Sequence, residues 1–131
     1  MKDHLSDYTE YRLAKAKEAI ADVKLLAQNN RWTACMNRMY YACFYAASAL
    51  MAKEGIAVKT HSGLKTKFNL HFVKTGLISK EQGKLYAQLM DWRDKGDYGD
   101  TLNIDADNVM PMLKPVEEFV VTIIALIGNY S

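Results

Sequence analysis

The chain has 131 residues, of which half are hydrophobic and 24% are charged. This length allows one domain with a hydrophobic core, and the composition argues against disorder. Seventeen basic residues against fifteen acidic ones give a net charge of +2, so bulk charge does not predict nucleic-acid binding. Any such site must be local, and we predict one domain that spans residues 1–131.

No segment of the sequence has the length and apolarity of a membrane span. The longest uncharged run, residues 39–52, is shorter than the roughly 20 apolar residues that a bilayer requires. The first residues, MKDHLSDYTEYR, are polar and acidic, unlike a secretory signal peptide. We therefore expect a cytoplasmic protein with no membrane association.

The two cysteines, Cys35 and Cys43, lie eight residues apart in one helical pattern. That spacing separates them by roughly 12 Å along the helix axis. A disulfide needs Cα atoms within about 7 Å, so the two are expected to be buried thiols. Neither has metal-ligand spacing to a histidine, and we expect no metal and no cofactor.

The first two helices are predicted from apolar residues that recur at steps of three and four. The first is expected to begin near Ser6 or Asp7, because Asp7 and Glu10 have the spacing of a capping box. It stops at two consecutive asparagines, and Asn30 can cap the second helix. The second helix ends at Gly55.

The third and fourth helices have similar signals. The third runs from about Thr60 to Thr75 and stops before a glycine. The fourth begins at Ser79, whose partner Gln82 completes a second capping box, and it ends near Gly96.

The fifth helix is led by Asp105 or Asp107 and contains Pro111 and Pro115. Because proline removes a backbone hydrogen bond inside a helix, we expect a late start or a kink there. No segment alternates apolar and polar residues as a strand does. With short connections, the prediction is an all-α, five-helix up-and-down antiparallel bundle. The core is expected to contain Trp32, Phe44, Phe68, Leu89 and Ile123.

His61 is placed at the start of the third helix by the segment KTHSG. Exposed backbone N–H groups at a helix N-terminus can bind an anion, which makes His61 a candidate binding residue. The alternative is a capping turn in which Thr60 or Ser62 satisfies those same groups.

Tyrosines cluster in the second helix, in the segment NRMYYACFYA. Tyr41 and Tyr45 lie four residues apart on one face, and Arg38 precedes Tyr41 by three. Arg38 can reach a phosphate, with Tyr41 as a stacking surface. The alternative is that the aromatic stripe belongs to the core or to an oligomer interface.

The segment RDKGDYGD, residues 93–100, closes the fourth helix. Arg93 follows Leu89 by four residues, at the border of the buried stripe, so its guanidinium can point into a cleft or interface. Asp97 and Tyr98 are expected close to it. The alternative is an ion pair between Arg93 and Asp97 or Asp94 that only closes the helix.

Four sequence features together resemble the HEPN domain, in its uncharacterised prokaryotic branch. They are Arg-x-x-Tyr-Tyr-Ala in the second helix, His-Ser-Gly opening the third, Phe-Val-Lys-x-Gly ending it, and Arg…Gly-Asp-Tyr closing the fourth. The resemblance implies a five-helix bundle that is usually dimeric. It also implies a minimal nucleotidyltransferase as partner, often in a toxin–antitoxin pair whose HEPN member is the toxin.

Catalytic members of that superfamily are metal-independent ribonucleases with an Arg-x(4–6)-His motif. An arginine can stabilise the charge of the phosphorane, and a histidine can move protons. The resemblance places the arginine at Arg93 and the polar residue after it at Asp94. The histidine position falls on Tyr98, Gly99 or Asp100, so the proton-transfer residue departs from the motif. A tyrosine with a pKa of about 10 is a poor base at pH 7.

These features lead to two functional hypotheses. The first is a toxin-type subunit that binds nucleotide or RNA near Arg93 and works with a nucleotidyltransferase, for which Tyr98 is a candidate site of nucleotide attachment. The second is an active ribonuclease in which His61 supplies the missing histidine or Tyr98 suffices. In both cases we expect a homodimer with two copies of Arg93 around one cleft.

Overall fold

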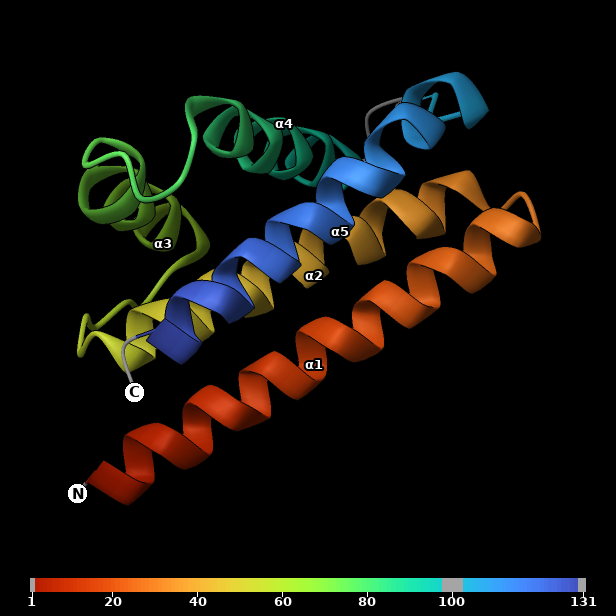
Figure 1. The fold of residues 1–131 in the computed structure, drawn as a ribbon. Helices are drawn as coiled ribbons and strands as arrows, with labels where there is room; N and C mark the ends of the chain where they lie inside the picture. Colours follow the sequence, from red (N-terminus) through yellow and green to blue (C-terminus); the bar gives the residue numbers. More distant parts are fainter. Residues whose placement is uncertain (1, 98–102, 130–131) are drawn as a thin grey trace.

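The computed structural model describes residues 2–97 and 103–129, and within these ranges it contains helices and no strands (Figure 1). The all-α prediction is therefore confirmed. The elements in chain order are α1 (Lys2–Gln28), α2 (Trp32–Lys53), α3 (His61–Phe68), the π-helical segment η1 (Asn69–Val73), α4 (Lys80–Asp97) and α5 (Ala106–Asn129).

Helix α2 lies at the centre of the bundle and contacts α1, α3, α4 and α5. Figure 1 shows α1 running alongside α2, with α5 crossing over α2 on the other side. Small side chains on α2 allow this close approach, because an alanine takes up little space between two helix backbones. Four alanines of α2 have no exposed surface, and they are Ala42, Ala46, Ala47 and Ala49. The five-helix bundle expected from the sequence is confirmed.

Three of the five predicted core residues are fully buried, namely Phe68, Leu89 and Ile123. The other two, Trp32 and Phe44, are only partly buried and pack against the edge of the core. Trp32 is the first residue of α2, where fewer neighbours surround it. Phe44 lies on the flank of α2 and stacks on His61 with the ring centres 4.3 Å apart. For these two residues the core prediction was wrong.

The predicted start of the first helix was also wrong, because α1 begins at Lys2 and passes through Asp7 and Glu10. Neither proline nor glycine occurs between residues 2 and 10, so no backbone constraint stops the helix at the apparent capping box.

Asn30 ends α1 and does not cap α2. It has a left-handed φ of +57°, and its N–H donates to the carbonyl of Ala27. The N–H of Arg31 donates to the carbonyl of Leu26, which completes the pair of bonds of a Schellman motif. Asparagine tolerates this conformation better than most residues. Arg31 takes the cap position of α2 without a side-chain hydrogen bond to it.

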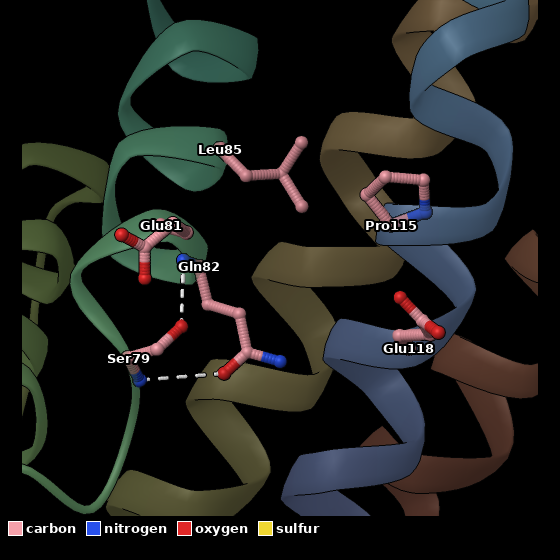
Figure 2. Close-up of a pocket in the computed structure, with 6 residues that line it drawn as sticks. All are labelled: Ser79, Glu81, Gln82, Leu85, Pro115 and Glu118. Atoms are coloured by element: carbon pink, nitrogen blue, oxygen red, sulfur yellow. Dashed lines mark hydrogen bonds between the residues drawn. The ribbon is translucent and has the colours of Figure 1, made fainter.

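The capping box predicted at the start of α4 is confirmed (Figure 2). The N–H of Gln82 donates to Ser79 Oγ at 3.1 Å, and the N–H of Ser79 donates to Gln82 Oε1 at 3.4 Å. A reciprocal pair of the same kind joins Asp105 and Asn108 before α5. These polar side chains satisfy backbone donors that a helix start leaves open.

Helix α5 includes both of its prolines, so the predicted late start was wrong. Neither ring nitrogen can donate, which removes the hydrogen bonds that Pro111 and Pro115 would otherwise make four residues back. The apolar face of α5 offsets this loss, since Val116, Phe119 and Ile123 are completely buried. A kink at either proline stays a prediction.

Both cysteines are buried free thiols, as expected.

The third predicted helix is found, but its second half is η1, a π-helix followed by a turn at Gly76, which has a φ of +86°. Among the described helices, none combines the length and the apolarity needed to cross a bilayer.

Candidate functional site

The candidate site is built around Tyr40, a side chain of α2 with no exposed surface. Its phenol oxygen lies 2.5 Å from Nδ1 of His61, at the start of α3. The guanidinium carbon of Arg93, from α4, lies over the same ring at 5.3 Å from its centre. Residues from three helices therefore meet on one tyrosine. We call the group Tyr40, Tyr41, Phe44, His61 and Arg93 the Tyr40 cluster.

Arg93 lies on the buried face of α4. That face is formed by Tyr86, Leu89 and Met90, and Arg93 follows Met90 by three residues and Tyr86 by seven. The side chain of Arg93 is accordingly only 19% exposed. A cation held over an aromatic ring in this way is stabilised by about 0.5–2 kcal/mol.

Asp94 pairs with the same guanidinium, with 3.2 Å between its Oδ1 and Nη1 of Arg93. The Asp94 carboxylate is 45% exposed, so solvent screens the pair and its contribution is small. The pairing that the sequence offered as an alternative is thus present. Asp97 is the last residue of α4. Its side chain and all of Tyr98 lie outside the described residues.

The helix start at His61 is capped by Thr60, whose Oγ1 accepts from the N–H of Gly63 at 2.9 Å. This is the alternative that the sequence offered to an anion site. His61 instead points to α2, where it stacks on Phe44 with an interplanar angle of 8° and meets Tyr40. The proposed role of His61 as part of a helix-start anion site therefore loses one of its backbone donors.

Tyr40 orients His61 through their hydrogen bond. Burial raises the pKa of Tyr40 to about 12, so the phenol keeps its proton at neutral pH. A neutral phenol both donates and accepts, so its contact with Nδ1 suits either tautomer of the imidazole. With either tautomer this hydrogen bond holds the imidazole ring in one orientation.

A second buried tyrosine, Tyr86 of α4, stacks on Tyr40 with ring centres 5.9 Å apart and an interplanar angle of 11°. Burial raises the pKa of Tyr86 as well. Its hydroxyl has no hydrogen-bond partner in the part of the chain that the structure describes. Both phenols are therefore neutral at physiological pH, and neither can act as a base there.

Arg38 and Tyr41 of α2 are half-buried and lie next to Tyr40 and His61. The guanidinium carbon of Arg38 lies 5.6 Å from the centre of the Tyr41 ring. Its Nε lies 3.6 Å from Oδ2 of Asp22. Tyr41 meets Tyr40 edge to face at 5.0 Å and His61 at 6.2 Å. Five of the seven residues predicted for binding are thereby brought together around Tyr40.

Sequence reasoning missed Tyr40 itself. The signal was present, because Tyr40 follows Met36 by four residues and precedes Ala47 by seven, on the buried stripe of α2. The neighbouring Tyr41 and Tyr45 attracted attention because of their spacing. In the fold it is Tyr40 that connects His61 to Arg93.

A separate cavity of about 510 Å³ lies between the start of α4 and α5. Figure 2 shows Leu85 extending toward Pro115 across it, with a glutamate from each helix at its sides. Glu81 and Glu118 make it unfavourable for phosphate. In the described ranges, no three histidine, cysteine, aspartate or glutamate side chains gather closely enough to hold a metal ion. The cluster of cations and aromatic rings around Tyr40 is the better candidate for a phosphate ligand.

Comparison with known proteins agrees with this fold. The model of the HEPN domain matches residues 9–125. A UPF0332 protein of Thermotoga maritima is 41% identical over 120 residues, which cover 92% of this chain and 91% of that protein. A UPF0332 protein of Archaeoglobus fulgidus is 31% identical, with 87% and 90% covered. A Methanocaldococcus jannaschii protein named "Putative toxin" is 32% identical, with 63% and 62% covered. This chain belongs to the HEPN domain family.

Proposed function

We propose that this chain is a toxin-type HEPN subunit that binds a phosphate of RNA or of a nucleotide at Arg93. The main observation in support is that the Arg93 guanidinium lies over the Tyr40 ring. The side chain of Arg93 is 19% exposed. A guanidinium fixed against a ring loses less freedom when it binds, and its planar fork matches a phosphate. The M. jannaschii relatives whose names describe toxins support the toxin-type role.

The contact with Asp94 is compatible with phosphate binding. A guanidinium has five N–H donors, and the contact with Asp94 involves Nη1. A second cation, Arg38, lies over the neighbouring Tyr41, whose ring meets that of Tyr40 edge to face.

The protein acts as a homodimer with a minimal nucleotidyltransferase as its partner. In a symmetric dimer, two copies of Arg93 face one cleft, which concentrates positive charge that the whole-chain composition does not show. The partner transfers a nucleoside monophosphate from a nucleoside triphosphate to the hydroxyl oxygen of Tyr98, with release of pyrophosphate and of the phenol proton; Tyr98 follows Arg93 by five residues. Mass spectrometry after incubation with the partner and a nucleoside triphosphate tests this. A nucleotide adduct on the wild type and none on Tyr98→Phe is expected, whereas an equal adduct on both contradicts it.

One observation favours a second candidate function, that of a metal-independent ribonuclease. Tyr40 contacts both His61 and Arg93, with ring centres of Tyr40 and His61 5.8 Å apart. The motif histidine absent from the end of α4 would then be supplied from α3. In that reaction the 2′-hydroxyl of the RNA attacks phosphorus and the bond to the 5′-oxygen breaks, while His61 takes the proton of the 2′-hydroxyl and returns a proton to the leaving 5′-oxygen. Arg93 stabilises the negative charge on the phosphorane oxygens, and Tyr40 orients the imidazole.

Labelled single-stranded RNA separates the two functions. Binding and cleavage are measured for the wild type, Arg93→Ala, His61→Ala and a control, Lys95→Ala. Lys95 is a matched cation two residues from Arg93, 55% exposed and paired with Asp91 at 3.1 Å. The binding function predicts intact RNA and weaker binding by Arg93→Ala alone. The ribonuclease predicts cleavage that is lost in both Arg93→Ala and His61→Ala. Equal binding by all four proteins, without cleavage, contradicts both.

A further inference from the structure

A second group of cations and aromatic rings lies on the N-terminal half of α1. Tyr8 and Tyr11 are 44% and 56% exposed, unusual values for side chains of this size. Tyr8 precedes Arg12 by four residues, and Tyr11 precedes Lys15 by four. The two tyrosines are three residues apart, so all four side chains share one flank of the helix. We call Tyr8, Tyr11, Arg12 and Lys15 the α1 flank.

The two cations of the α1 flank each lie over a tyrosine ring of the same helix. The guanidinium carbon of Arg12 lies 5.1 Å from the centre of the Tyr8 ring, and its Nε donates to the Tyr8 hydroxyl at 2.9 Å. The Lys15 ammonium lies 5.8 Å from the centre of the Tyr11 ring. No carboxylate of the described residues lies within 4 Å of either cation. No carboxylate of the described side chains therefore neutralises their positive charge by a direct ion pair.

The α1 flank is continuous with the Tyr40 cluster. Besides Tyr8, Arg12 lies over two rings of α2, at 5.7 Å from the centre of Phe44 and 5.5 Å from that of Tyr45. Phe44 in turn stacks on His61. A series of ring and cation contacts thus runs from Tyr8 through Arg12 and Phe44 to Tyr40, over which Arg93 lies.

We infer that the α1 flank is a second RNA-contact surface, on which a single strand that enters the Arg93 site stacks its bases. This rests on the proposed function. The two cations, which pair with no carboxylate of the described side chains, suit a phosphate backbone. The exposed tyrosines suit unpaired bases, which stack on aromatic side chains without regard to sequence. A duplex keeps its bases inside the helix and offers none to Tyr8 or Tyr11. Single-stranded RNA is therefore the occupant that uses both features of the surface.

The test compares a labelled 12-nucleotide single strand with a labelled dinucleotide, which reaches the Arg93 site alone. Fluorescence anisotropy is measured for the wild type, a Tyr8→Ala/Tyr11→Ala double variant, and Arg12→Ala. Leu25→Ala is the control, since Leu25 is a 59% exposed residue of α1 outside the flank. We expect the double variant to lose about tenfold or more in affinity for the 12-mer, as two stacking contacts imply. Its affinity for the dinucleotide stays that of the wild type, and Leu25→Ala binds both normally.

Equal affinity of the wild type and the double variant for the 12-mer overturns the inference while leaving the proposed function intact. Equal affinity of the wild type for a duplex of the same length also overturns it. If the wild type binds neither oligonucleotide, the proposed function itself fails. Circular dichroism melts serve as the control that each variant is folded. A change from dimer to monomer in the double variant, by light scattering, overturns the inference in favour of a protein interface.

Discussion

The Arg93 guanidinium of α4 lies over the Tyr40 ring of α2, at 5.3 Å from the ring centre. The hydroxyl of Tyr40 is also hydrogen-bonded to Nδ1 of His61. One buried phenol therefore positions both the cation and the imidazole of the candidate site. The ring and the hydroxyl have separate tasks, because the ring supports Arg93 and the hydroxyl orients His61.

Two substitutions of Tyr40 separate these tasks. Tyr40→Phe keeps the ring and loses the hydrogen bond, so the free energy of unfolding should fall by about 0.5–1.5 kcal/mol, with RNA binding retained. Tyr40→Ala removes a fully buried ring and should cost about 3–5 kcal/mol, with RNA binding lost. Urea denaturation and RNA titration measure both effects. Equal losses in the two variants would contradict the division of tasks.

The buried tyrosines predict a loss of stability at high pH. Burial raises the pKa of Tyr40 to about 12 and that of Tyr86 further above the ordinary value of 10. The unfolded chain therefore releases these protons first, at pH values above about 10. The contribution of the two protonated tyrosines to the free energy of unfolding is complete below about pH 10, and it is lost as the pH rises toward 12 and beyond. Burial of Cys43 acts in the same direction from about pH 9.

Urea midpoints measured between about pH 8 and pH 11 test this dependence. The wild-type midpoint should be constant up to about pH 9 and fall above it. Tyr86→Phe removes one of the raised groups, so its midpoint should fall less over the same interval. A midpoint that does not change up to pH 11 is the contrary result.

The cap of α3 should contribute measurably to stability. Thr60→Ala removes the acceptor of the Gly63 N–H and should lower the free energy of unfolding by about 1 kcal/mol. Thr60→Ser keeps a hydroxyl at the same position and should cost much less. Chemical denaturation of both variants provides the measurement. Equal stability of Thr60→Ala and the wild type would mean that the cap contributes nothing.

Dimer formation is predicted for this protein in solution. Light scattering at micromolar concentration should give twice the chain mass of 14.9 kDa. The interface expected for such a dimer buries more than roughly 1,000 Å². A monomer under these conditions would remove the shared cleft from the proposed function.

Periodicity in the sequence predicted the existence of the helices, although α2, which contacts four other helices, is buried on more than the one stripe that its spacing indicated. The capping box of Ser79 and Gln82 was also predicted correctly, because its two partners are three residues apart and the signal is local in the sequence. The similar spacing of Asp7 and Glu10 gave a wrong start for the first helix, because a helix continues through such a pair when no proline or glycine interrupts it.

The site was harder to predict, since its contacts join distant parts of the chain. Arg93 and His61 were both named from the sequence, but their meeting on Tyr40 depends on how α3 and α4 pack against α2. Arg12 was not singled out at all. Its environment comes from rings of two helices, and no local spacing reveals that arrangement.

The most direct test of the central claim is the salt dependence of RNA affinity. Anisotropy titrations of labelled single-stranded RNA at several salt concentrations give both the affinity and the number of phosphate contacts. Arg93→Ala should bind about tenfold or more weakly, with a log–log salt slope smaller by about 0.7, as the loss of one phosphate contact requires. Lys95→Ala should match the wild type in affinity. An Arg93→Ala protein with the affinity and the salt slope of the wild type would contradict the account.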